Sequence, residues 1–185
     1  MREAELLGKW LTVEGFRNVK LENTQKLVAE VKTQAADCCI QLLDPSLVAG
    51  FDHLFFASLN ALKAFEAERN ISKDLGVEVL LYASGQHQIS KAIRLLGIKS
   101  DFKEVAVLVI AETHDKAKEA MDKVSNLLKG EQHGGVIELT ETKVPKIMSA
   151  FNIGKEEVEA VKRTSESQAV SDLVVERCAL LAAQV

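Results

Sequence analysis

The stretch EVAVLVIAETHDKAKEAMDKVSNLLKG, residues 104–130, decides the fold class. After its first residue, the segment Glu104–Ala111 is uninterruptedly apolar, which is typical of a strand at the centre of a sheet. Thr113 then offers a side-chain oxygen to cap a helix, whose apolar residues recur every three or four positions as far as Leu128 and which Gly130 closes. A buried strand followed at once by an amphipathic helix predicts helices packed on a sheet.

Outward from this stretch, short apolar or alternating runs bounded by turn residues predict further strands. They lie at Lys9–Val13, Arg17–Leu21, Cys38–Leu43, Val77–Ala83 and Gly135–Thr140. We therefore expect an α/β (α+β) fold with a single mixed sheet of about four to five strands and packed helices. We expect one domain over residues 1–185, with an α/β core over 1–141 and a helical C-terminal extension over 142–185 packed on it.

Capping residues delimit the other predicted helices. Asn23 begins one helix, and Asp52 begins another that is apolar nearly all round, with Phe51 placed to pack on Phe56. A third helix carries Ile89, Ala92, Ile93 and Leu96 on one face and ends at Gly97 in the left-handed conformation. A short helix begins at Pro145, and the tail is helical from residue 155 with a break near Ser165.

Composition limits the class of protein. Hydrophobic residues make up 47% and charged residues 27% of the 185, which is typical of a globular domain. The longest apolar run is far shorter than the roughly 20 residues of a membrane-spanning helix, and no signal peptide is visible, so we expect a cytoplasmic protein without membrane contact. The three cysteines include no C-x-x-C pair, which favours free thiols and no structural zinc. The net charge of −4 argues against bulk nucleic-acid binding but allows a local basic patch.

Catalytic motifs are missing from the sequence. It contains no phosphate-binding G-x-x-x-x-G-K-[ST] loop, no G-x-G-x-x-G turn and no pair of histidines at helical spacing. Ser84-Gly85-Gln86 resembles half of a nucleophile elbow, but Tyr82 stands where the elbow needs glycine, so a helix cap is the better interpretation. We expect no enzymatic activity, no cofactor and no metal.

Two surfaces invite a functional interpretation. His87, Lys91 and Arg94 recur at i, i+4 and i+7 opposite an apolar helix face, so they form either a solvated face or a phosphate-binding site. Lys63, Arg69, Lys73 and Lys99 lie on either side of this helix in the sequence. The apolar residues of the last helix either pack on the domain's own sheet or dock another protein.

The arrangement of several segments is similar to a known family. These segments are residues 51–65, VEVLLYASG at 77–85, QISKAI at 88–93 and LGI at 96–98, with VPKIM at 144–148 and the helical tail. They resemble the kinase-binding regulatory subunit of the KEOPS complex, the CGI/TPRKB family, in its archaeal form. The likeness is strong over residues 50–111 and looser elsewhere.

The resemblance implies a non-catalytic role. A subunit of this kind binds and stimulates the small atypical kinase/ATPase of KEOPS and contacts the other KEOPS subunits indirectly. The complex makes N6-threonylcarbamoyladenosine at position 37 of tRNA, and this subunit is implied to hold the 3′ CCA end of the tRNA. The alternatives are a small α/β metabolic enzyme with an unrecognised pocket, and a generic protein-interaction module.

On this interpretation the two surfaces acquire candidate partners. Family members often carry a basic residue just before the Gln-Ile pair, where this chain has His87, which weakens the expected phosphate contact. The candidate tRNA contacts are Lys63, Arg69, Lys73, His87, Lys91, Arg94 and Lys99. The candidate kinase contacts are Ile147, Met148, Val170, Leu173, Val174 and Arg177.

Overall fold

The computed structural model describes residues 1–183, and the chain divides into two compact units. Unit 1 comprises Met1–Pro45 and Gly97–Val136, and unit 2 comprises Ser46–Leu96 and Ile137–Val185. The helices between residues 51 and 96 therefore belong to the same unit as the C-terminal helices. The expected boundary between an α/β core and a C-terminal extension at residue 141 stays a prediction. The single domain stays a prediction.

Unit 1 contains the sheet, with strand order β1-β2-β4-β3 and a short β5 that also pairs with β2. Every pairing described is antiparallel, so the sheet is not mixed. The predicted central strand is confirmed, because Val109 of β4 lies opposite Thr12 of β2 on one side and Ile40 of β3 on the other. The strands are β1 (Arg2–Leu6), β2 (Lys9–Arg17), β3 (Cys39–Leu43), β4 (Glu104–Ala111) and β5 (Glu131–Gln132).

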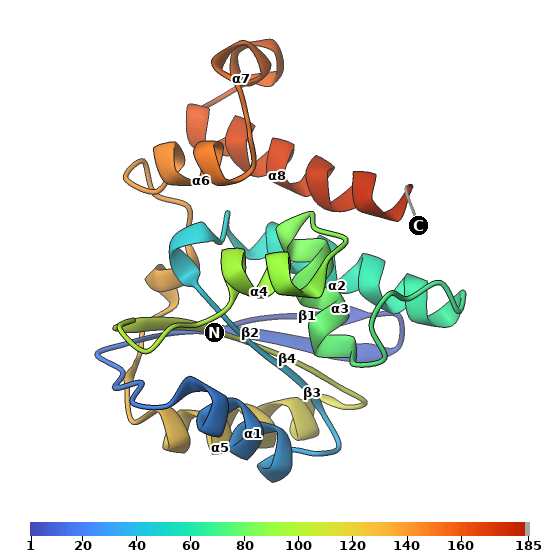
Figure 1. Ribbon diagram of the computed structural model, residues 1–185, viewed down its shortest axis with the longest axis vertical. Helices are drawn as coiled ribbons and strands as arrows, with labels where there is room; N and C mark the ends of the chain where they lie inside the picture. Colours follow the sequence, from blue (N-terminus) through green and yellow to red (C-terminus); the bar gives the residue numbers. More distant parts are fainter. Residues whose placement is uncertain (184–185) are drawn as a thin grey trace. The chain divides into compact units, whose positions relative to one another are not determined.

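Helices α1 (Thr24–Gln34) and α5 (His114–Leu128) lie side by side on one face of this sheet (Figure 1). Both predicted caps are confirmed: Asn23 accepts a hydrogen bond from the Lys26 N–H at 2.9 Å, and Thr113 accepts one from the Lys116 N–H at 3.3 Å. Apolar residues of both helices pack with the odd-numbered residues of β4 into one buried cluster. This cluster is the core that residues 104–130 predict.

Unit 2 is built from helices. They are α2 (Phe51–Glu66), α3 (Leu75–Ser84), α4 (Ile89–Leu96), α6 (Val144–Ala150), α7 (Lys155–Val161) and α8 (Glu166–Ala182). Helix α2 packs against α3 and α8, and α3 packs against α4. The short helix at Pro145 and the break before α8 are confirmed, with the Ser165 side chain capping α8 through the Gln168 N–H at 3.1 Å.

The predicted strand at Val77–Ala83 is wrong, because these residues form α3. Asp74 caps this helix through the Val77 N–H at 3.0 Å, and Gly85 ends it with φ of +59°. Nearly all of α3 is buried, so its apolar residues show no helical periodicity that would distinguish it from a buried strand.

Several smaller predictions are also wrong. Lys9–Val13 and Arg17–Leu21 are not two strands, since β2 runs continuously through Gly15 to Arg17. The predicted strand at Gly135–Thr140 is replaced by a 3-10 turn at Gly134–Ile137.

Three predicted helix ends lie elsewhere. Helix α2 begins at Phe51 after Gly50, and not after Asp52. The left-handed residue that ends α5 is Lys129 and not Gly130, and Gly97 does not have a positive φ.

The α/β fold class, with four to five strands and packed helices, is confirmed. All three cysteines are free, with Cys178 buried and the other two half-buried. Within residues 1–183, no helix is long and apolar enough to cross a membrane.

Candidate functional site

Helix α4 is only partly covered by its own unit. Ala92 and Leu96 are completely buried. Ile89 and Ile93, which belong to the same apolar face and lie one turn apart, expose 40% and 51% of their surface. The sequence pattern predicts this apolar face correctly but does not reveal that half of it faces solvent. We call the exposed pair Ile89 and Ile93 the α4 flank.

The basic residues of α4 lie on another side of the helix. His87, Lys91 and Arg94 are all exposed, as their spacing predicts. No Asp or Glu occurs between Glu78 and Asp101, so no acidic residue on this segment offsets their charge. Lys99 is exposed too, but it belongs to unit 1, where its ammonium lies 5.7 Å from the centre of the Phe102 ring.

The other three candidate tRNA contacts lie on α2 and on the loop of residues 67–74 that follows it. Lys63, Arg69 and Lys73 are exposed, but the exposed carboxylates of Glu66 and Glu68 share this part of the chain. Local charge is therefore nearly balanced here, in contrast to α4. The role of these residues in binding tRNA stays a prediction.

A buried carboxyl group fixes the loop of residues 67–74. The Glu78 side chain, fully buried on α3, accepts hydrogen bonds from the N–H groups of Ile71 at 3.2 Å and Ser72 at 2.7 Å. Burial and the nearby Glu78 charge raise the pKa of Tyr82, an effect that Arg69 partly offsets. Sequence reasoning missed Glu78, although a lone carboxylate in the otherwise apolar run 77–83 is the signal of such a role.

A buried histidine joins α2 to the end of α3. His53 is fully buried, and its Nδ1 accepts a hydrogen bond from the Ala49 N–H at 3.1 Å. Its Nε2 donates to the Ala83 carbonyl at 2.7 Å, and its ring meets Phe151 edge-on at 5.6 Å. Burial lowers the pKa of His53 to about 4, only partly opposed by the Ala83 hydrogen bond, so the ring is neutral near pH 7. His53 therefore has a structural role in supporting α3, on which α4 packs.

The candidate kinase contacts divide into two groups. Ile147, Val170, Leu173 and Val174 are buried in unit 2, where α8 packs against α2 and α3. The apolar pattern of α8 is thus explained by packing against the helices of its own unit. Met148 is half-buried. As a set of kinase contacts, these residues stay a prediction.

Arg177 differs from the others because it is partly exposed and held in place. Its guanidinium forms an ion pair with Glu157 at 2.5 Å. A hydrogen bond from the Gly154 N–H, together with Arg177, lowers the pKa of Glu157. A Cβ at Gly85 would lie 3.8 Å from the Arg177 Cβ, so this part of α8 borders the turn that leads into α4. Leu180, one turn further along α8, exposes 44% of its surface.

Comparison with known proteins identifies the family. The model of the kinase-binding protein CGI-121 family matches residues 16–182, which is most of the chain. The chain belongs to the CGI-121 family. A relative in Methanocaldococcus jannaschii, named regulatory protein Cgi121, is 32% identical over 113 residues, which cover 61% of this chain and 70% of the relative. The resemblance found in the sequence is therefore confirmed at the level of the family, and both units contribute to the matched region.

Every candidate residue of this CGI-121 chain lies within the matched region. Unit 2 carries the α4 flank, the basic side of α4 and the exposed part of α8, whereas Lys99 belongs to unit 1. The described residues contain no group of three or more His, Cys, Asp or Glu side chains placed to hold a metal ion.

Proposed function

We propose that this protein is a non-catalytic regulatory subunit that binds a protein kinase through the α4 flank. The description of its family as kinase-binding supports the partner. The observation that carries the location is the exposure of Ile89 and Ile93, two isoleucines one turn apart on the helix face whose other members, Ala92 and Leu96, are buried. Adjacent exposed aliphatic side chains of this kind are typical of a docking site for another protein.

The docking surface extends onto α8. Arg177 borders the turn before α4, and Leu180 follows it one turn later. Arg177 is held by Glu157, so little side-chain freedom is lost when it meets a partner. Apolar anchors beside a positioned arginine are the residue types that most often dominate protein interfaces. We therefore propose this exposed surface for the kinase contact, whereas a contact through the buried residues of α8 stays a prediction.

The kinase that fits the resemblance is the small atypical kinase/ATPase of the KEOPS complex, whose ATP hydrolysis this protein would stimulate in the cytoplasm. Other KEOPS subunits would then be contacted through the kinase. The absence of recognisable catalytic motifs from the sequence supports a regulatory role over the alternative of a metabolic enzyme. Steady ATP hydrolysis by the purified chain alone, beyond that of a mock preparation, would favour the enzyme.

Co-purification with the kinase of the same organism tests the docking surface. Ile93→Glu places a charge at the centre of the α4 flank, and because Ile93 is half-exposed, the variant should fold. Loss of an apolar anchor commonly costs about 2 kcal/mol or more, which is roughly a thirtyfold loss of affinity. Val161→Glu, an equivalent change at an exposed residue of α7, should bind as the unaltered chain does. Equal binding by both variants would remove α4 from the interface.

We further propose that the basic side of α4 contacts the phosphates of tRNA, near its 3′ CCA end. Lys91 and Arg94 are exposed and supply positive charge in a segment that has no Asp or Glu between Glu78 and Asp101. Each phosphate contact that is lost should lower the slope of log affinity against log salt concentration by a little under one unit. His87 precedes this helix and is exposed as well.

The test compares tRNA affinity over a range of salt concentrations. Lys91→Glu/Arg94→Glu should bind more weakly and with a shallower slope, and tRNA without its 3′ tail should show the same loss with the unaltered chain. Lys155→Glu/Arg163→Glu changes the net charge equally on exposed residues beside α7 and serves as the control. If both double variants lose affinity equally, net charge and not α4 accounts for binding.

A further inference from the structure

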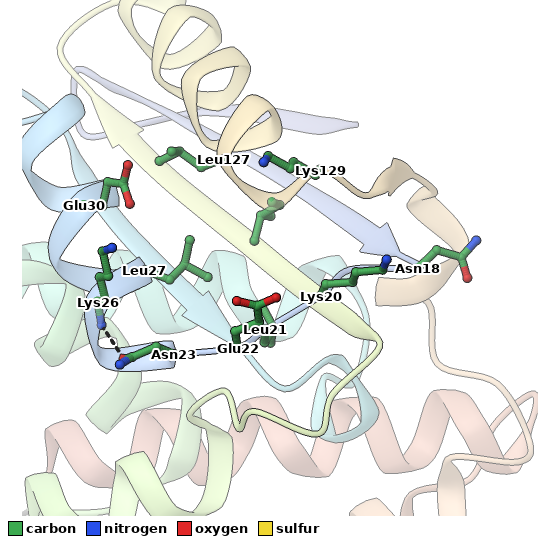
Figure 2. Close-up of a pocket in the computed structure, with 11 residues that line it drawn as sticks. Asn18, Lys20, Leu21, Glu22, Asn23, Lys26, Leu27, Glu30, Leu127 and Lys129 are labelled. Atoms are coloured by element: carbon green, nitrogen blue, oxygen red, sulfur yellow. Dashed lines mark hydrogen bonds between the residues drawn. The ribbon is translucent and has the colours of Figure 1, made fainter.

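Unit 1 contains a hollow of about 610 Å³ at the start of α1 and the end of α5. This volume falls within the range of about 300–1,000 Å³ that is usual for small-molecule sites. Figure 2 shows side chains reaching it from three segments: the connection between β2 and α1, α1 itself and the end of α5. None of these residues belongs to the surfaces that we assign to the kinase or to tRNA.

The floor of the hollow is apolar. Leu21 and Leu128 are buried there at 5% and 2% exposure, and Leu27 and Leu127 are half-buried beside them. These four leucines come from three segments, since Leu127 and Leu128 are neighbours on α5, and they line the hollow together with polar side chains. A flat apolar group of a ligand would find contact here.

The rim of the hollow carries three ammonium groups. Lys20, Lys26 and Lys129 are exposed, and in the described part of the chain none of them forms an ion pair within 4.0 Å. Two carboxylates, those of Glu22 and Glu30, share the rim. The rim thus offers cations for an anionic group and acceptors for hydroxyl groups.

The segments that supply lining residues on two sides of the hollow pack closely against each other next to it. A Cβ on Gly130 would lie 2.5 Å from Val19 Cγ1 and 2.8 Å from the Arg17 carbonyl, so only glycine lets these segments approach so closely. The Val19 N–H in turn donates to the Lys103 carbonyl at 3.0 Å. Lys129 stands next to this contact with φ of +52°, a conformation uncommon for a residue with a side chain. A preformed site loses little conformational entropy on binding.

We propose that this hollow binds a nucleotide. The ammonium groups would hold the phosphate, the carboxylates of Glu22 and Glu30 would accept hydrogen bonds from the sugar hydroxyls, and the leucines would contact the base. Each of the three chemical parts of a nucleotide thus has a counterpart in the lining. The same chemistry describes a free mononucleotide or one nucleotide within a single-stranded RNA.

Titration of the purified chain with AMP, ADP and ATP, and separately with a short single-stranded RNA, tests this proposal. Lys20→Glu/Lys26→Glu should weaken binding about tenfold or more, because two of three charge-assisted contacts become repulsive. Lys116→Glu/Lys118→Glu changes the net charge equally on exposed residues of α5 outside the lining and should bind as the unaltered chain does. Circular dichroism should show both variants folded.

The outcomes separate the two sources of the ligand. If the unaltered chain binds mononucleotides and Lys20→Glu/Lys26→Glu does not, the ligand of the hollow is a free nucleotide. If the unaltered chain binds only RNA and the same variant loses that binding, the ligand is a nucleotide within a strand. No binding of any probe at millimolar concentration, or equal binding by both variants, overturns the proposal. Lys91→Glu/Arg94→Glu should leave mononucleotide binding intact, so a failure of the tRNA proposal at α4 is distinguishable from a failure here.

Discussion

Replacing the buried His53 by phenylalanine should remove a specific part of the pH dependence of stability. The pKa of His53 is about 4 in the folded protein, against 6.5 for an unperturbed histidine. Because the folded state resists protonation, the unfolded state binds the proton first as the pH falls. Stability from this residue is therefore fully present above pH 6.5 and is lost progressively as the pH falls towards 4. The difference of about 2.5 units corresponds to about 3 kcal/mol.

The assay is urea denaturation of the unaltered chain and of His53→Phe between pH 4 and pH 8. At pH 8 the variant should be less stable by about 1–3 kcal/mol for each unpaired backbone group, because the Ala49 N–H and the Ala83 carbonyl lose their partner. The gap should then narrow by about 3 kcal/mol as the pH falls from 6.5 to 4. The other three histidines are present in both proteins, so their contribution cancels. A gap that stays constant over this range would refute the reasoning.

Three further substitutions test the packing of the two units. Leu173→Ala should lower the free energy of unfolding by about 2–5 kcal/mol, measured by urea denaturation, because this side chain of α8 is only 4% exposed. An unchanged denaturation midpoint would contradict its burial. Glu78→Gln should speed amide hydrogen exchange at Ile71 and Ser72, because the N–H groups of both residues donate hydrogen bonds to the Glu78 carboxylate. Unchanged exchange would mean that the loop of residues 67–74 is ordered without these hydrogen bonds. Gly130→Ala should destabilise unit 1 by about 1–3 kcal/mol, because the new Cβ would overlap Val19. An unchanged melting temperature would show that Val19 can move aside to make room for the methyl group.

Most of the fold follows from local signals in the sequence. The segment 104–130 predicts the central strand, its helix and the helix cap, because one apolar run and one amphipathic run stand side by side. The failure at α3 has a physical cause: a segment buried on every side shows no periodicity, and length alone does not separate a ten-residue helix from a strand. Asp74 and Gly85 carried the missing information, as a helix cap and a left-handed terminus.

The sequence predicts which residue types form the candidate site, but it does not predict which of these side chains are exposed to solvent. The spacing of residues 87–96 gives the two faces of α4, yet the sequence does not reveal that Ala92 and Leu96 are covered while Ile89 and Ile93 are not. The converse holds for α8, where an apolar pattern that suits docking belongs to the interior. Exposure depends on which elements pack together, and that depends on long-range contacts that no local pattern records.

The rate of ATP hydrolysis by the small atypical kinase of the same organism, measured at increasing concentrations of this chain, tests the central claim most directly. We predict a saturable increase, with half-saturation shifted roughly thirtyfold to higher concentration by Ile93→Glu and left unchanged by Val161→Glu. A kinase rate that does not respond to the chain, or a response that Ile93→Glu leaves unaltered, would contradict a regulatory subunit that acts through α4.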